Sequence, residues 1–528
     1  MVSDAIDISK ARSKRNEPPR ATGDRPAITI STREHEVTAQ SLAVVGHHDE
    51  IYQRGGMLVH PVKDHRPKSN LSRPEGAAYI SELQPARLRE MLAEKCYFLK
   101  PDKKGEFKPA HVPDWLVKQI CARKQWDDIR PLEAISETPV LRGDGSVIDV
   151  PGYDAPTGVL FAPNRTYPRC PNRPTQEDAQ AAIQTLLDPF VDFPFSEQYH
   201  QSAVLAGILT PLARFAFSGP SPLVVITKNV RGAGGSLLAD AISIAATGRG
   251  MARMTQAGDE DEERKRILSI AMAGDRMVLI DNVDQPLGGA ALDAALTGTE
   301  WRDRVLGRSE MVTAPLLATW FATGNNPTIL GDTIRRVLPI RIVSRDEKPE
   351  ERTGFRYDPL ERHMVAQHPN LVVAALTVLR AHSIAGRPGM GLKPWGSFEG
   401  WSSVVRAALV WAGQVDPALG REELAEGADE QALALKTLFT NWKQVDYSGH
   451  GVTAQRILET VTEGGSGETA EALKMAILQL APGKGDSMPS AVSLGKRLSH
   501  HVGRVVSGMS LSSSMSRTNV RIWRVNGI

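Results

Sequence analysis

Apolar and polar positions follow different periods along the chain and so separate strands from helices. Three short apolar runs, at residues 222–227, 276–281 and 318–324, have the length and composition of buried strands. Segments with apolar residues at helical spacing lie before and between them. Strands that alternate with helices in this way are typical of an α/β domain built on a parallel sheet. The predicted fold class is therefore α/β, with a mixed α+β domain before this core and a further domain after it.

The rest of the chain divides into regions of different pattern. The pair Gly55-Gly56 interrupts an alternating segment and predicts the turn of a small hairpin. Pro113 stands at the entry of a predicted helix in a region that mixes helical and strand-like patterns. The predicted organisation is a disordered leader at 1–40, a small strand segment and linker at 41–75, an N-terminal α+β domain at 76–200, an α/β core at 201–345, a helical region at 346–440 and a C-terminal domain at 441–528.

Composition narrows the class of protein. A chain of 528 residues is too long for one hydrophobic core, which agrees with several domains. No apolar run is long enough to span a membrane, and the polar N-terminus has no apolar segment of a signal peptide. Cys96, Cys121 and Cys170 are far apart and form no CxxC pair, which argues against a disulfide framework or a structural zinc site. These features predict a cytoplasmic protein with no membrane partner.

A glycine-rich turn follows the first predicted strand and precedes a helix, in the run KNVRGAGGSLLAD. Such a turn points backbone N–H groups at one spot, and the helix dipole adds partial positive charge there. The glycines let the backbone approach a phosphate, and the serine hydroxyl stands where a P-loop hydroxyl holds Mg²⁺. The turn predicts a site for ATP and Mg²⁺ whose nucleotide-binding residues are Arg231, Gly232, Ala233, Gly234, Gly235, Ser236 and Leu237.

Polar residues at the ends of the later strands complete a candidate catalytic site. Asp281 ends the second strand and is predicted to hold Mg²⁺ together with the P-loop serine. Asn282 follows where many such ATPases have a glutamate that polarises water, and Asn325 ends the third strand, where it can sense the γ-phosphate. Arg335 and Arg336 precede a closing strand and are candidates for an arginine finger that reaches a neighbouring subunit.

Each of these features has a structural alternative. The glycines can form an ordinary strand–helix turn, Asp281 can cap a turn, Asn325 can form an Asx turn, and the arginine pair can be a solvated helix end. All four features occur in the right chain order, each at a strand end or just beyond it. Because open α/β sheets bind ligands at the carboxyl ends of their strands, the joint placement favours a nucleotide site.

The run LIDNVDQPLGGAALDAALTGTEWRDRVLGRSEMV, with WFATGNN and GDTIRRVLPIRI after it, resembles the ATPase core of phage- and plasmid-type primase–helicase proteins. These proteins are related to superfamily 3 helicases and poxvirus-type ATPases of the AAA+ class. The similarity extends to YQRGGMLV and TPVLRGDGSVIDVPGYD upstream and to SLGKRLSHHVGRVVSGMSL and RIWRV downstream. It implies a ring-forming, hexameric AAA+ ATPase that acts in DNA replication of a mobile element such as a phage, a plasmid or a genomic island.

The chain departs from this family at the P-loop lysine, where it has Gly235, and at the leading glycine, where it has Asn229. The lysine is a point charge on the β- and γ-phosphates in both the ground and the transition state. Its loss predicts weak or absent nucleotide binding and little hydrolysis, unless Lys228 or Arg231 moves in to compensate. Replacing Gly235 by lysine is then expected to raise ATPase activity.

Two cationic segments are candidates for contact with DNA. The first lies between the second and third strands and contains Trp301. Superfamily 3 helicases resemble this layout, with a hairpin that lines the central channel of the ring, where cations follow a nucleic-acid backbone without reading its sequence. The alternative is a helix with internal Arg–Asp pairs and a core tryptophan. The candidate residues are Arg302, Arg304 and Arg308.

The second cationic segment is the C-terminal one, which has no acidic residue after Asp486. It looks like a winged helix, with LGKRLSHHVG as the recognition helix and RTNVRIWRV as the second strand of the wing. Trp523 is predicted to lie on the apolar face of that strand. The alternatives are a protein-contact module and a solvated basic tail. The candidate DNA-binding residues are Lys496, Arg497, Arg504 and Arg521.

Two functions of different class fit these features. One is a ring-forming DNA helicase motor, which the strand-end residues Asp281 and Asn325 and the arginine pair favour. The other is a non-catalytic AAA+ scaffold or DNA-binding initiator, which the P-loop without a lysine favours. The sequence shows no spaced acidic triad or zinc ribbon of a primase, so a primase or initiator would be a separate partner. The expected nucleic-acid partners are single-stranded DNA, double-stranded DNA or both.

Overall fold

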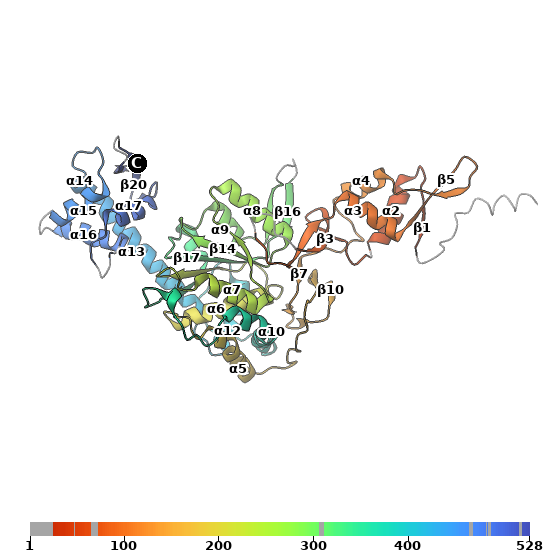
Figure 1. Ribbon diagram of the computed structural model, residues 1–528, viewed down its shortest axis with the longest axis horizontal. Helices are drawn as coiled ribbons and strands as arrows, with labels where there is room; N and C mark the ends of the chain where they lie inside the picture. The colour runs from red at the N-terminus through yellow and green to blue at the C-terminus, as the bar shows by residue number, and fades with distance from the viewer. Residues whose placement is uncertain are drawn as a thin grey trace, which may run out of the picture.

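The computed structural model describes residues 25–46, 48–64, 72–305, 311–463, 468–481, 483, 487–516 and 520–527. The molecule is elongated in Figure 1. The N-terminal elements lie at one end, the central sheet in the middle and the C-terminal helices at the other end.

A five-stranded parallel sheet forms the centre of the molecule, with strand order β13–β14–β17–β12–β18. The three predicted strands form its middle, and two short strands close its edges. The predicted α/β class with a parallel sheet is therefore confirmed, and the sheet is compatible with a P-loop-type core. The strands are β12 (Leu223–Lys228), β13 (Ala252–Met254), β14 (Met277–Val283), β17 (Thr319–Asn325) and β18 (Val337–Ile342).

Both faces of this sheet are covered by helices and are therefore buried. Successive side chains of each strand point in opposite directions, so each strand contributes to a hydrophobic cluster on either face. In β12, Val224 and Ile226 join one hydrophobic cluster, whereas Leu223 and Val225 join the other. Helices α6, α7 and α10 cover the first face, and α8 and α9 the second (Figure 1). The bounds of these helices are Gln198–Ala213, Gly235–Thr247, Leu360–Ile384, Glu260–Ala273 and Ala290–Ala295.

Further short elements surround the sheet. Helix α5 begins with a capping box, in which the Thr175 hydroxyl accepts from the Asp178 N–H and the Asp178 carboxylate accepts from the Thr175 N–H. The other helical elements around the core are α5 (Gln176–Leu187), η1 (Asp188–Phe190), η2 (Gly331–Arg336), η3 (Pro349–Glu351), α11 (Glu399–Trp401), η4 (Ser402–Arg406), α12 (Ala407–Trp411), η5 (Pro417–Leu419) and α13 (Gly420–Thr440).

The prediction of a disordered leader over 1–40 is wrong for its last part. β1 (Ala27–Thr29) pairs in parallel with β5 (Tyr97–Pro101), and α2 (Glu34–Val45) follows it. The segment reads as polar because only one face of α2 is apolar, and that face is buried in a cluster with α3 (Pro85–Lys95) and α4 (Asp114–Ala122). Residues 1–24 of the predicted leader lie outside the described part of the chain.

The predicted hairpin around the glycine pair is present. β2 (Tyr52–Arg54) and β3 (Met57–Lys63) are antiparallel, and both glycines have positive φ, +57° and +74°, as a two-residue hairpin turn requires. β4 (Ala78–Glu82) extends this hairpin to three strands. The remaining strands before the core are β6 (Phe107–Pro109), β7 (Ala134–Ser136), β8 (Val140–Leu141), β9 (Val147–Ile148), β10 (Gly152–Asp154) and β11 (Val159–Phe161).

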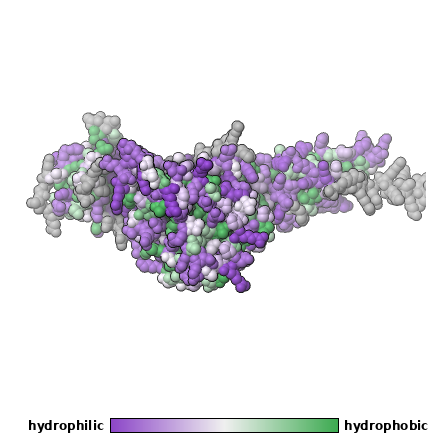
Figure 2. Space-filling view, turned by 60° about the horizontal axis from the view of Figure 1, so that its bottom comes forward, coloured by the Kyte–Doolittle hydropathy of each residue, from purple (hydrophilic) through white to green (hydrophobic). Residues whose placement is uncertain are grey.

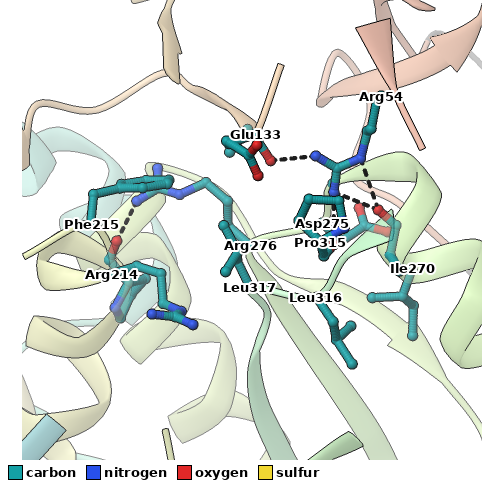
Figure 3. A pocket seen from close by; sticks show the side chains of 14 residues that line it. Arg54, Glu133, Arg214, Phe215, Ile270, Asp275, Arg276, Pro315, Leu316 and Leu317 are labelled. Carbon is teal, nitrogen blue, oxygen red and sulfur yellow. Dashed lines mark hydrogen bonds between the residues drawn. The ribbon is translucent and has the colours of Figure 1, made fainter. Parts of the chain in front are cut away.

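Arg54, at the end of β2, joins this hairpin to the core (Figure 3). Its guanidinium donates to Ala271 O at the end of α8, to Leu132 O and Glu133 O before β7, and to Pro315 O. The side chain is buried, and this burial lowers the pKa of Arg54 to about 10. The space left beside it is about 10 Å³, which is too small for a ligand. Arg54 is therefore a structural connector.

Replacing Arg54 by methionine is expected to lower the free energy of unfolding by about 2–4 kcal/mol, because several buried carbonyl groups lose their donor. Chemical denaturation followed by circular dichroism measures this change. Replacing the exposed Arg33, which pairs with Glu36 on the surface, is the matched control and is expected to change stability by less than about 0.5 kcal/mol. An Arg54→Met protein as stable as the parent would contradict the connecting role.

The described C-terminal part places helices α14 to α17 before a small antiparallel sheet of order β19–β20–β21. Trp523 is almost fully buried in its core, as predicted for the apolar face of the last strand. The elements are α14 (Trp442–Val445), α15 (Ala454–Glu463), α16 (Glu468–Leu480), α17 (Ala491–Ser499), β19 (Val505–Val506), β20 (Met509–Met515) and β21 (Arg521–Gly527).

The face seen in Figure 2 is mostly hydrophilic, with apolar residues scattered over it. Among the described residues, no helix combines the length and apolar content needed to cross a bilayer.

Candidate active site

The glycine-rich turn connects β12 to α7 at the carboxyl edge of the sheet. Gly232 and Gly234 have φ of +79° and +86°, a left-handed conformation that favours glycine. Gly234 is the N-cap of α7, so the free N–H groups of the first helical turn face the same edge. Arg231 and Leu237 are exposed on either side of the turn, whereas Ala233 is buried. The local backbone therefore has the form of an anion site.

Ser236 and Asp281 meet in front of this turn. The Ser236 Oγ donates to Asp281 Oδ1 over 3.0 Å, and the Thr323 Oγ1 of β17 donates to the same oxygen over 2.6 Å. The other carboxylate oxygen, Oδ2, pairs with Arg253 at 3.2 Å. The structure thus brings together the two residues predicted to hold Mg²⁺, and it fixes the orientation of the carboxylate from both sides.

A bulge in β14 explains how Asp281 reaches the serine. The register of β14 against β17 shifts between Ile280 and Val283, so two residues bulge out of the ladder. Asn282 is one of them and has φ of +54°, a left-handed conformation that asparagine tolerates better than most residues. Its N–H donates to Thr323 Oγ1 over 3.0 Å. The backbone therefore gives a reason for asparagine after the strand-end aspartate.

Asn325 ends the neighbouring strand and lies beside the turn. Oriented as a donor, its amide group reaches Lys228 O at 2.7 Å and Asn229 O at 3.2 Å. A cleft of about 1500 Å³ contains Asn325 together with Lys228, Arg231 and Asn282. Two of the predicted strand-end residues, Asn282 and Asn325, therefore open into one space.

Three residues of the site, Arg253, Asp240 and Thr323, were not predicted. Arg253 lies on the edge strand β13 and pairs with Asp240 of α7 as well as with Asp281. Its strand of three residues is too short to give a periodic signal, so nothing in the sequence pointed to it. Thr323 had a weak signal, since it stands two residues before Asn325 on a predicted strand.

An apolar pocket of about 340 Å³ adjoins the other side of the turn. Phe193, Phe355 and Tyr357 line it together with Gly232 and Gly234. Its size lies within the usual range for small-molecule sites, and aromatic walls suit the flat face of a base. The pocket continues from the anion site, as a nucleoside joined to its phosphates requires.

The two candidate finger residues differ in their surroundings. Arg335 has a side chain that is 82% exposed, with Asp332 at 4.0 Å as its nearest carboxylate. Arg336 is 21% exposed and pairs with Asp293 at 3.4 Å. Both lie on η2, just before β18. An outward-facing guanidinium suits contact with a second molecule, so Arg335 is the better candidate of the two.

The cationic segment after β14 is a β-hairpin and not a helix. β15 (Glu300–Arg304) and β16 (Met311–Pro315) pair antiparallel, and Trp301 is buried at their base. Arg302 and Arg304 are exposed, whereas Arg308 lies outside the described residues. Asp303 pairs with Arg264 of α8 at 3.0 Å.

The predicted C-terminal cations face the same large cleft as the strand tips. Lys496 and Arg504 are exposed, and the cleft is also lined by Arg497 and Arg521. The predicted recognition helix is shorter than its sequence run, because α17 ends at Ser499. The two following histidines lie outside it. His501 is buried, and burial lowers its pKa to about 4, so it is a neutral core residue.

Within the described ranges, no group of three or more His, Cys, Asp or Glu side chains is placed to hold a metal ion. Such a group is not needed for Mg²⁺ in a nucleotide site, where one or two protein ligands act with the phosphates. The three cysteines are free thiols, and burial raises the pKa of Cys96 to about 11.

No protein-family model and no curated protein matches the chain. Among solved structures, it is similar to the A-form apo structure of the C-terminal region of NrS-1, with 12% sequence identity, a TM-score of 0.32, and 85% of this chain and 100% of that chain covered. It is also similar to the X-ray structure of JCV helicase, with 14% identity, a TM-score of 0.23, and 45% of this chain and 67% of that chain covered. With TM-scores this low, neither likeness carries an argument about this chain.

Proposed function

We propose that the chain is a helicase-type AAA+ ATPase that acts on DNA in the replication of a mobile element and works as a ring. One observation carries the proposal. Ser236 Oγ and Asp281 Oδ1 lie 3.0 Å apart, in front of a glycine turn that opens α7 at the carboxyl edge of a parallel sheet. This arrangement fits Mg²⁺ and a triphosphate, because a hydroxyl, a carboxylate and free backbone N–H groups converge there.

Each residue has a defined task in such a site. The N–H groups at the start of α7 hold phosphate oxygens, and the nearby aromatic pocket accepts the base. Ser236 and Asp281 hold Mg²⁺, which when bound neutralises charge on the phosphates. Arg253 keeps the carboxylate oriented through its contact with Oδ2. Asn282 and Asn325 are placed to orient water at the γ-phosphate end.

Two surfaces are proposed to contact DNA. The β15–β16 hairpin would line the channel of a ring with Arg302 and Arg304, where electrostatic attraction follows the backbone without reading the bases. The C-terminal helices and sheet, proposed as a winged helix, would place α17 and its cations on duplex DNA. The cations of α17 and of the segment after it line the cleft that also contains Asn282 and Asn325. The base of the β15–β16 hairpin instead lies toward the amino ends of the central strands, where Arg54 donates to Pro315 O.

The second candidate function is a non-hydrolysing AAA+ scaffold or DNA-binding initiator. The absence of a lysine at position 235 favours it. The two functions share the nucleotide pocket but differ in turnover.

ATPase activity of the full chain, with and without single-stranded DNA, tests the proposal. Electron micrographs of the same samples show whether rings form. Turnover that DNA stimulates, together with rings, supports the helicase-type ATPase. Nucleotide binding without turnover supports the scaffold. No nucleotide binding at all contradicts the ATPase, and a chain that binds neither nucleotide nor DNA contradicts both functions.

Replacing Lys496 and Arg504 together by alanine is expected to weaken DNA binding and to reduce its salt dependence. Each lost phosphate contact lowers the slope of log K against log salt by about 0.9 for duplex DNA. Fluorescence anisotropy at several salt concentrations measures both effects. Arg87→Ala is the matched control, because Arg87 lies on α3 among three glutamates. If the double variant kept the slope of the parent protein, Lys496 on α17 and Arg504 after it would not contact DNA.

A further inference from the structure

Lys228 is the last residue of β12 and stands seven positions before the glycine that occupies the P-loop lysine position. A Cβ atom placed on Gly235 would lie 3.3 Å from Lys228 Cδ and 3.8 Å from Lys228 Nζ. The lysine side chain therefore passes directly over Gly235 and brings its ammonium group into the space above the first turn of α7. The absence of a side chain at position 235 leaves room for this path.

The groups around Lys228 fix its backbone at the site and do not neutralise the charge of its ammonium group. Its strand is the second of the five from the edge, with β17 and β18 on either side, and the Asn325 amide contacts its carbonyl oxygen. Among the described residues, no carboxylate is within ion-pair distance of its Nζ, and the carboxylates of Asp281 and Asp240 pair with Arg253. Its charge is thus available to a bound anion.

We propose that Lys228 takes the place of the missing P-loop lysine and contacts the β- and γ-phosphates of the nucleotide. This inference rests on the proposed function. Arg231 is the other cation of the turn, but its side chain is exposed, whereas Lys228 lies against the helix start. The charge that phosphoryl transfer requires then comes from the strand before the loop instead of the helix after it. The lack of a lysine at position 235 therefore overstates the loss of phosphate binding and hydrolysis.

The test compares the affinity of the full chain for MgATP, MgADP and AMP by isothermal titration calorimetry, together with ATP turnover. Lys228→Met keeps the aliphatic stem over Gly235 and removes the ammonium. It is expected to weaken binding of ATP and ADP about 10- to 100-fold and to leave AMP binding nearly unchanged, because only the β- and γ-phosphates lose their contact. Lys393→Met, at a surface pair with Glu422, is the control for a lysine-to-methionine change.

A second variant separates a phosphate contact from a structural effect. In the Lys228→Met background, Gly235→Lys supplies an ammonium from the usual position and is expected to restore ATP affinity and turnover. In the parent protein, the same substitution places two lysine side chains in one space. It is therefore expected to give no gain, which replaces the rise in ATPase activity that the sequence alone predicts.

The possible failures can be told apart. A Lys228→Met protein that binds and hydrolyses ATP like the parent overturns the inference and leaves the proposed function standing. Equal losses for ATP and AMP, with no rescue by Gly235→Lys, also overturn it, because they indicate a structural role. A parent protein that binds none of the three nucleotides overturns the proposed function, and the inference with it.

Discussion

Replacing Asp281 by asparagine is expected to lower the rate of ATP hydrolysis by at least about 100-fold. The carboxylate accepts a hydrogen bond from the Ser236 hydroxyl, and its Oδ1 is the oxygen proposed to act on Mg²⁺. Asparagine keeps the size of the side chain and loses its charge, so the metal loses an anionic partner while the strand remains intact. Steady-state turnover at saturating MgATP measures the effect.

A second aspartate provides the control for this change. Asp154 pairs with Arg142 at 2.7 Å in the region before the core, away from the sheet edge. Asp154→Asn removes an ion-paired carboxylate of the same kind and is expected to leave turnover unchanged. If the two variants behaved alike, Asp281 would have no special place in the reaction.

Replacing Arg335 by alanine is expected to reduce turnover about 1000-fold or more, because an arginine finger stabilises the charge of the transition state. The side chain is 82% exposed and is proposed to act on the nucleotide of a neighbouring subunit. Arg336→Ala breaks a pair with Asp293 within the same chain and is expected to have a smaller effect on turnover. The turnover rates of the Arg335→Ala and Arg336→Ala proteins are compared at protein concentrations at which rings assemble.

Mixing inactive variants tests whether Arg335 acts between subunits. Asp281→Asn supplies an intact finger, and Arg335→Ala supplies an intact metal site. Mixed rings contain some interfaces with both intact parts, so a mixture of the two is expected to recover part of the activity. If the mixture stayed as inactive as its components, Arg335 would not act across an interface.

The sequence predicted the elements whose signal is local and strong. The three central strands were visible because parallel strands are buried on both faces and so read as continuous apolar runs. The meeting of Ser236 and Asp281 followed from chain order, since the carboxyl ends of parallel strands share one edge. The hairpin at Gly55-Gly56 was visible because its turn needs residues with positive φ.

The parts that were missed depend on contacts between distant segments. Helix α2 looked like part of a leader because most of its surface is polar, and its buried face has meaning only against α3 and α4. Arg253 enters the site through a three-residue edge strand that no periodic pattern reveals. The path of Lys228 over Gly235 depends on side-chain direction, which spacing along the chain does not give.

The most direct measurement is an experimental structure of the full chain with Mg²⁺ and a non-hydrolysable ATP analogue. Phosphate density is expected at the start of α7, with Mg²⁺ against Ser236 and Asp281 and the base beside Phe193. Density for the analogue anywhere else, or none at saturating concentration, would contradict the claim that the strand tips of this sheet form a nucleotide pocket.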